Sequence, residues 1–443
     1  MTASLAHRDV WRIAAPLILS NVSVPLLGIV DTAVMGHLDE PRYLGAVAVG
    51  ATVFSFLFLG FNFLRMGTTG VAAQAHGSGD TDEMRNTLAQ ALLSAAGLAL
   101  VLLVLQKPLA IAAWRLIEPD ALVQAQAEIY YAIRIWSAPA VLANYALIGW
   151  FIGMQNGRVP LVLMLGINLT NIALDLLFVI GFGMKVEGVA LATLIAEFTG
   201  AGLGIWLVRR ELARRPGRWQ RARILDGHRF RRLLDLNMNL FIRTVSLMFA
   251  FGFLTAQAAR LGTVVLAANA VLLNFQYLMS YALDGFAHAA EALVGRAIGQ
   301  RGRTGFLRAV RICMLWSLIV ALVFCLIYAV AGRHLIDAMT DLREVRQTAY
   351  IYLPWLIVLP LVSVWSFVYD GIYVGATRAR EMRDTMLFSA FAVYLPAWYM
   401  LRFLGNHGLW LAFVLFMVAR GSSMHWLYRR IEARGEFARG MPD

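Results

Sequence analysis

The chain has 443 residues, of which 60% are hydrophobic and only 15% are charged. Soluble domains are usually about 45–50% apolar and about 25% charged, so the composition excludes an ordinary soluble domain. The formal net charge of +12 does not indicate a nucleic-acid partner, because the basic residues lie in short loops between apolar runs, where membrane proteins place them.

The apolar runs define the predicted elements, because about 20 apolar residues span a bilayer. The first run is too long for a cleavable signal and contains an acid, Asp31, so we interpret it as a membrane helix. We predict twelve membrane helices, at residues 11–38, 44–75, 86–107, 124–153, 159–181, 188–209, 229–260, 266–298, 306–332, 345–376, 382–404 and 408–430. The predicted fold class is an all-α polytopic membrane protein.

The longest polar stretch, Arg209–Arg232, is rich in arginine and separates two sets of six predicted helices. The positive-inside rule places such a segment in the cytoplasm. We therefore predict an N-terminal lobe at residues 1–210, a cytoplasmic linker at 211–228 and a C-terminal lobe at 229–443. Because each lobe has an even number of helices, both termini are expected to be cytoplasmic.

The two halves of the chain repeat each other weakly. Gly77 and Gly299 are separated by the same interval as Gly149 and Gly371, namely 222 residues (299 − 77 = 371 − 149). An internal duplication of membrane helices is typical of transporters, in which two related bundles alternate the side that is open. The repeat predicts two pseudo-symmetric six-helix bundles and makes transport the leading hypothesis.

Polar residues at membrane depth form one candidate site in the N-terminal half. Asp31 and Asp175 are acids within apolar helices, and Asn171 lies one turn before Asp175. Thr193, early in the next helix, falls at a similar depth. Two such carboxylates can hold a proton near neutral pH, or bind Na⁺ together with the Asn and Thr oxygens. In the alternative interpretation, each acid only accepts hydrogen bonds or pairs with Arg134.

Two prolines, Pro16 and Pro25, share the first helix with Asp31. Each removes a backbone hydrogen bond and permits a bend. We interpret them as hinge candidates whose alternative role is to fit the helix to its neighbours.

The C-terminal half has its own polar set. Asp284, His288 and Glu291 lie on one helical stripe, and Asp370 and Arg243 are also at membrane depth. These residues either contact a cationic substrate or guard a gate, or they form a polar network that holds helices together.

No pattern indicates an enzyme, a cofactor or a metal site. The sequence has no phosphate-binding glycine loop, zinc-ligand spacing or nucleophile motif. Active transport would therefore be driven by an ion gradient. Plentiful aromatic and methionine side chains suit a promiscuous apolar pocket for organic cations.

Four segments carry a resemblance to a known family. They are Ala15–Asn21 with Val30–Gly36, the Asn171-x-x-x-Asp175 pair, Tyr281–His288 and Asp370–Arg378. With these, nearly the whole chain resembles the multidrug and toxic compound extrusion (MATE) family, and within it the DinF-like (DNA-damage-inducible protein F) branch. The resemblance implies twelve helices in two lobes, and export of amphipathic, often cationic compounds by H⁺ or Na⁺ antiport.

The resemblance also implies roles for single residues. Asp31 matches the usual coupling acid of the branch, and Asn171, Asp175 and Thr193 match its companions. Pro16 matches the proline at which the first helix is proposed to bend, and Tyr130 is a further partner. Other branches place a coupling glutamate on the seventh helix, where this chain offers Arg243, whereas Asp370 lies near another acid of those branches.

We predict an antiporter of the bacterial inner membrane that exports small amphipathic compounds, with membrane lipid around it, as a monomer. H⁺ is the predicted coupling ion, because two acids with few further oxygen ligands suit a proton, and Na⁺ is the alternative. The rival functions are a flippase for lipid-linked saccharides and, more remotely, a channel or receptor without coupled transport.

Overall fold

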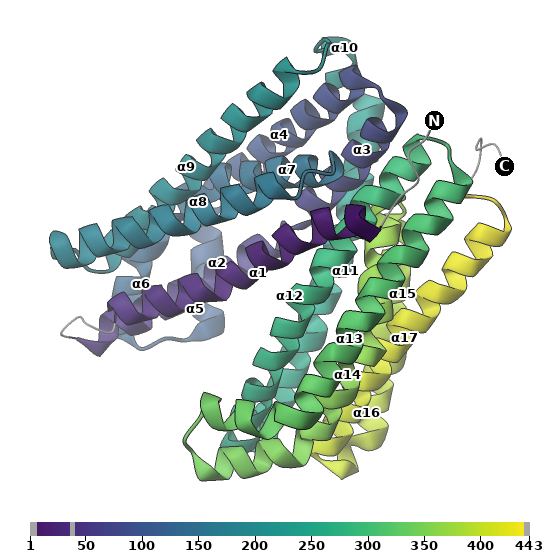
Figure 1. Cartoon of the computed structure of the whole chain (residues 1–443). Helices are drawn as coiled ribbons and strands as arrows, with labels where there is room; N and C mark the ends of the chain where they lie inside the picture. The colour runs from purple at the N-terminus through teal and green to yellow at the C-terminus, as the bar shows by residue number, and fades with distance from the viewer. Residues whose placement is uncertain (1–6, 36–39, 438–443) are drawn as a thin grey trace. The chain divides into compact units, whose positions relative to one another are not determined.

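The computed structural model describes residues 7–35 and 40–437, except for the side chains of residues 24–35 and 41 (Figure 1). Every regular element in this part of the chain is a helix. The first half contains α1 (His7–Met35), α2 (Pro41–Gly60), α3 (Phe63–Ser78), α4 (Thr81–Val104), α5 (Gln106–Ile117), α6 (Ala121–Arg134), η1 (Ile135–Ser137), α7 (Ala138–Gly153), α8 (Arg158–Asp175), η2 (Leu176–Gly181) and α9 (Val186–Ala213).

The second half follows a short helix, α10 (Arg221–Ile224), and repeats this pattern. It contains α11 (Gly227–Leu261), α12 (Thr263–Gly299), α13 (Arg303–Met339), α14 (Arg343–Gly375), α15 (Ala379–Leu387), η3 (Phe388–Tyr394), α16 (Leu395–Leu401), η4 (Arg402–Leu404) and α17 (Asn406–Ala433). Eleven helical segments in the described residues are long and apolar enough to cross a membrane. They coincide with the second to twelfth predicted helices, and α1 takes the place of the first. The predicted fold class is confirmed.

One predicted loop is a helix. Residues 108–123 were expected to connect two membrane helices, yet they contain most of α5. Pro108 cannot donate a hydrogen bond to Val104, so α4 ends there and the chain starts a second helix. In the second repeat the equivalent residue is Val330, and α13 runs unbroken from Arg303 to Met339. The interval of 222 residues therefore relates the pair α4 and α5 to the single helix α13.

The chain divides into two compact units. The N-unit is Leu19–Leu233, and the C-unit is Leu234–Asp443 together with Met1–Ile18, of which residues 7–18 are described. This division differs from the predicted lobes, because the first turns of α1 belong with the second half of the chain. Trp11 packs edge-on against Phe286 with ring centroids 5.2 Å apart, which explains the assignment.

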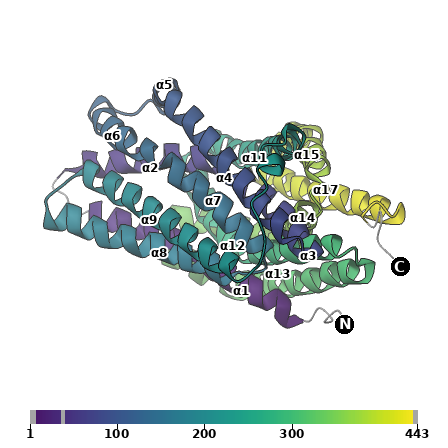
Figure 2. The same cartoon turned by 90° about the horizontal axis from the view of Figure 1, so that it is seen from above.

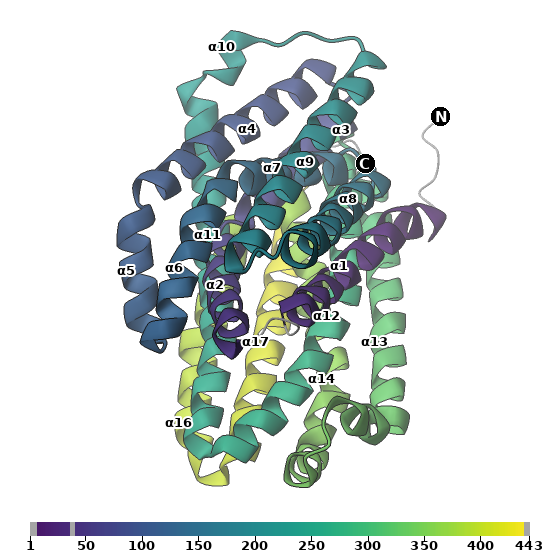
Figure 3. The same ribbon diagram turned by 90° about the vertical axis from the view of Figure 1, so that its left-hand side faces the viewer.

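Helix packing is repeated within the two units at the same interval. A Cβ atom on Gly153 of α7 would lie 2.7 Å from the backbone oxygen of Thr69, and one on Gly375 of α14 would lie 2.6 Å from that of Glu291. Thr69 and Glu291 are themselves 222 residues apart. Only glycine permits such close approach of two helices. Side by side, α8 and α9 run through the N-unit (Figure 2), and α12, α13 and α14 run through the C-unit (Figure 3).

The turns that follow equivalent helices also have matching backbone conformations in the two halves. Gly79 and Arg301 follow the ends of α3 and α12 with φ of 72° and 54°, and Gln155 and Thr377 follow α7 and α14 with φ of 61° and 55°. A β-branched residue rarely adopts a positive φ. Matching turns at the same interval therefore indicate that both halves descend from one duplicated six-helix pattern.

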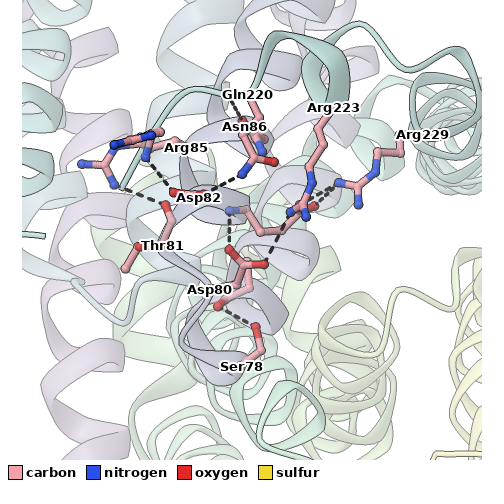
Figure 4. Close-up of polar contacts among 12 residues, drawn as sticks. Ser78, Asp80, Thr81, Asp82, Arg85, Asn86, Gln220, Arg223 and Arg229 are labelled. Carbon is pink, nitrogen blue, oxygen red and sulfur yellow. Dashed lines mark hydrogen bonds and ion pairs between the residues drawn. The ribbon is translucent and has the colours of Figure 1, made fainter. Parts of the chain in front are cut away.

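The arginine-rich segment after α9 is tied to the start of α4 within the N-unit (Figure 4). Asp82 accepts a hydrogen bond from the backbone nitrogen of Arg218 at 2.6 Å, and Glu83 accepts one from Arg229 at 2.6 Å. Arg85 donates to two carbonyl oxygens near the end of α9, at 2.9 and 2.7 Å. The segment therefore follows a defined path rather than acting as a free tether.

Candidate functional site

The N-unit brings three of the predicted site residues to the packed pair α8 and α9. The side-chain nitrogen of Asn171 donates to Oγ1 of Thr193 at 3.0 Å, and Thr193 donates to the carbonyl oxygen of Val189 at 3.0 Å. Asp175 lies one turn beyond Asn171 and is fully buried. Buried polar groups are costly in a membrane span and usually serve a function there, so this cluster is the leading candidate site.

Local backbone geometry changes at the acid. Asp175 is the last residue of α8, and the next six residues form the π-helical segment η2. A π-helical turn interrupts the regular pattern of backbone hydrogen bonds and is frequent at functional sites. Hydrophobic periodicity does not reveal this π-helical segment.

Two predicted residues lie outside the described side chains. The backbone of α1 continues through the positions of Pro25 and Asp31 to Met35, but the side chains of residues 24–35 are not described. The approach of Asp31 to Asp175 therefore stays a prediction. Pro16 is described and half-buried in α1, and the division between the two units falls just after it, between Ile18 and Leu19.

Tyr130 is buried on α6, which packs against α9. Its hydroxyl accepts a hydrogen bond from Arg134 at 3.0 Å, and the Arg134 guanidinium lies 5.3 Å from the ring centre of Phe54. Arg134 is therefore held by an aromatic face and a phenol. Tyr130 acts at least as the partner of this arginine.

Sequence reasoning missed a third acid within the apolar helices of the N-unit. Glu197 lies one turn after Thr193 on α9, and its Oε2 accepts a hydrogen bond from the side chain of Asn144 on α7 at 2.9 Å. Arg134 is near enough to interact with its charge. A glutamate four residues from Thr193 within an apolar helix was the signal that could have identified it.

In the C-unit, a buried carboxylate is shared by two arginines. Arg243 of α11 and Arg420 of α17 both donate to Oδ2 of Asp370 on α14. All three side chains are buried. Charge-assisted hydrogen bonds of this kind join three helices in a defined geometry, and Arg420 was not among the predicted residues.

The polar stripe predicted on α12 is present, as a histidine–glutamate pair and an acid one turn before the histidine. Nδ1 of His288 lies 3.3 Å from Oε1 of Glu291, and Glu291 is buried. Asp284 is half-buried one turn before His288 and interacts electrostatically with Arg420. The stripe therefore contains a histidine–glutamate pair and a separate acid near the arginines.

Comparisons with known proteins agree with this architecture. The family model MatE matches residues 16–177 and 240–400, once in each half. The chain is 44% identical over 427 residues to DNA damage-inducible protein F of Escherichia coli (strain K12), covering 96% of this chain and 92% of that protein. It is 23% identical to the multidrug resistance protein MdtK of Proteus mirabilis (strain HI4320), covering 96% of each.

Solved structures share the fold. An outward-facing multidrug resistance MATE family transporter aligns with a TM-score of 0.86 at 18% identity, over 97% of each chain. The Vibrio cholerae MATE transporter VcmN aligns with a TM-score of 0.85 at 20% identity, over 98% of each chain. With its duplicated helices, its eleven described spans and these matches, the chain belongs to the MatE family of multi-pass membrane transporters.

Proposed function

We propose that this transporter is a proton-coupled exporter of small amphipathic, often cationic compounds. The observation that carries the proposal is the buried cluster of Asn171, Asp175 and Thr193 within one half of a duplicated membrane transporter. The chain works as a monomer in the bacterial inner membrane with both termini in the cytoplasm. Relatives that are named as multidrug resistance proteins support this class of substrate.

The geometry of the cluster favours a proton over Na⁺. Thr193 Oγ1 accepts from Asn171 and donates to Val189, so one of its two acceptor positions is already occupied. A proton needs only the carboxylates of Asp175 and Asp31, which share it as a coupled pair if they approach each other as predicted.

Pro16 is the proposed hinge of the switch. It lies close before the point at which α1 passes from one compact unit to the other, and proline weakens the helix at that place. Protonation of Asp31 would remove a negative charge from α1 and allow the second part of this helix to pack differently. Pro25 is the second hinge candidate.

The test is transport by the purified protein in liposomes. An imposed pH gradient without Na⁺ is expected to drive ethidium toward the acidic side, and a protonophore should abolish that movement. Asp31→Asn and Asp175→Asn should each remove the response while ethidium binding persists. Asp120→Asn is the matched control, because Asp120 is an exposed helix cap and asparagine caps equally well.

Other outcomes would identify a rival function. If transport requires a Na⁺ gradient, the coupling ion is Na⁺ and not H⁺. Wild-type protein that responds to neither gradient, yet moves a lipid-linked saccharide between leaflets, would be a flippase.

A further inference from the structure

Glu197 is a glutamate in the middle of a membrane span, in the segment Val186–Ala213. Asn144 donates to its Oε2 at 2.9 Å and to its backbone oxygen at 3.1 Å. Gly200, one turn later, leaves room for that contact, since a Cβ atom there would lie 3.3 Å from the Asn144 nitrogen. The side chain is half-buried, and the coupling cluster does not include it.

Polar side chains lie at intervals of one helical turn between Glu197 and that cluster. Asp175 and Asn171 are one turn apart on α8, Asn171 donates to Thr193 on α9 at 3.0 Å, and Thr193 and Glu197 are one turn apart on α9. Each turn of four residues advances about 6 Å along a helix. With α9 descending toward the cytoplasmic linker, Glu197 extends the polar row inward. Ionisable residues within membrane segments commonly mark ion pathways.

The groups around Glu197 allow its charge to change. Arg134 of α6 interacts with its carboxylate, and Tyr145 of α7 interacts with Glu197, Arg134 and Arg65 of α3. A positive neighbour favours the charged carboxylate, whereas removal from water favours the neutral acid. A movement of Arg134 away from the carboxylate would therefore remove a positive charge from its surroundings.

The second repeat shows that helix packing does not require these polar residues. The residues 222 positions after Glu197, Asn144 and Arg134 are Ala419, Ser366 and Leu356. The glycines that bring helices together are kept in both repeats, as at Gly153 and Gly375. The fold is therefore built in the C-unit without the polar set, which points to a role beyond packing.

We propose that Glu197 is a second proton site, in addition to the Asp31 and Asp175 pair, and that it binds one proton of its own in each transport cycle. This inference rests on the proposed proton-coupled export. The proton arrives from the side of Asp175, forms the O–H bond of the neutral acid, and leaves toward the cytoplasm when Arg134 again faces the carboxylate.

The test measures the largest ethidium accumulation ratio at a fixed pH gradient, with the membrane potential clamped by potassium and valinomycin. This limiting ratio depends on the number of protons exchanged for each ethidium molecule and does not depend on the rate of transport. Losing one coupled proton at a gradient of one pH unit is worth about 1.4 kcal/mol, so Glu197→Gln should lower the ratio about tenfold. Glu197→Asp keeps a carboxyl group and should retain the wild-type ratio even if transport is slower.

Glu128→Gln is the matched control. Glu128 also accepts a hydrogen bond from a side-chain amide, that of Gln124 at 2.9 Å, but it is exposed on α6. The ethidium accumulation ratio of Glu128→Gln should therefore equal that of the wild type. A wild-type ratio in Glu197→Gln would overturn the proposal and leave Glu197 a packing residue. Loss of all accumulation in Glu197→Gln protein that still binds ethidium would also overturn it. Absence of accumulation in wild-type protein would instead contradict the proposed function.

Discussion

The carboxylate of Asp370 illustrates how a single buried residue can join three helices. It accepts from Arg243 and Arg420 together, so the three residues carry one unit of positive charge among themselves. Removing a buried charge that compensates another is costly, because the remaining ion is left without a partner in a low-dielectric site. Asp284 of α12 also interacts electrostatically with Arg420, so a fourth helix contributes to the balance of charge.

We therefore expect Asp370→Asn to destabilise the protein most, by about 3–5 kcal/mol, because two guanidinium groups lose their carboxylate. Arg420→Met should cost less, since Asp370 keeps Arg243. Thermal unfolding in detergent, followed by tryptophan fluorescence, measures both. The exposed pair Arg380–Asp235, 3.0 Å apart, is the control, and Arg380→Met should change stability by about 1 kcal/mol or less. Equal unfolding temperatures for Asp370→Asn and wild type would contradict this ordering.

At the scale of elements, close helix approach depends on glycine. Gly375→Ala would place a methyl group 2.6 Å from the Glu291 oxygen and 3.0 Å from the Gly295 nitrogen, so α12 and α14 would have to separate. We expect the free energy of unfolding to fall by about 1–3 kcal/mol, as for other overpacked cores.

Gly252→Ala on α11 is the control, because nothing lies within 4 Å of its added methyl. It should be neutral or stabilising by about 0.5–1 kcal/mol. Equal unfolding temperatures for the two variants would argue against the close approach.

The linker contacts are an element-scale feature found in only one repeat. Asp82 and Glu83, which hold the segment after α9, correspond to Thr304 and Gly305 in the second half. The acids therefore serve the linker rather than the fold of each bundle.

Asp82→Ala should free the linker locally. It removes the acceptor for two hydrogen bonds, from Arg218 and Gln220, each at 2.6 Å. Such bonds to a charged group contribute about 1.5–3 kcal/mol each, so trypsin should cut the arginine-rich linker about tenfold faster or more. Asp341→Ala removes an exposed loop acid in the C-unit and should leave the cutting rate unchanged. If Asp82→Ala is cut no faster than Asp341→Ala, the contacts do not restrain the linker.

At the scale of the whole molecule, the proposed antiport requires that proton and substrate oppose each other. A ligand shifts two conformations only by its differential affinity for them, and the coupling between two ligands is reciprocal. In an antiporter the proton favours the state that binds substrate less well. Ethidium affinity of wild-type protein should therefore fall as the pH drops through the titration of the acid pair.

Fluorescence anisotropy titrations over a range of pH measure this effect. Asp31→Asn should bind with an affinity that depends less on pH, because the proposed proton site at Glu197 remains. Pro16→Ala should keep binding but lose the pH response if Pro16 is the hinge. Affinity of the wild type that stays constant with pH would exclude the mechanism.

The sequence by itself determined the membrane-helical fold, the twelve helices and the duplication, because the length of an apolar run and the spacing of glycines are local properties of the chain. It also predicted Asn171, Asp175 and Thr193 as site residues, since polar residues stand out in apolar helices, and the structure joins Asn171 to Thr193 by a hydrogen bond. The helix α5 was not predicted, because Pro108 and nearby charges resemble a loop.

Only the tertiary structure decided which polar residues meet. Arg420 reaches Asp370 from a helix 50 residues away, and Asn144 reaches Glu197 from 53 residues away. It also decided that the first turns of α1 pack with the C-terminal half, where Trp11 contacts Phe286. The physical reason is that helix periodicity specifies which face a residue occupies, whereas the partner on that face depends on how separate helices pack together in space.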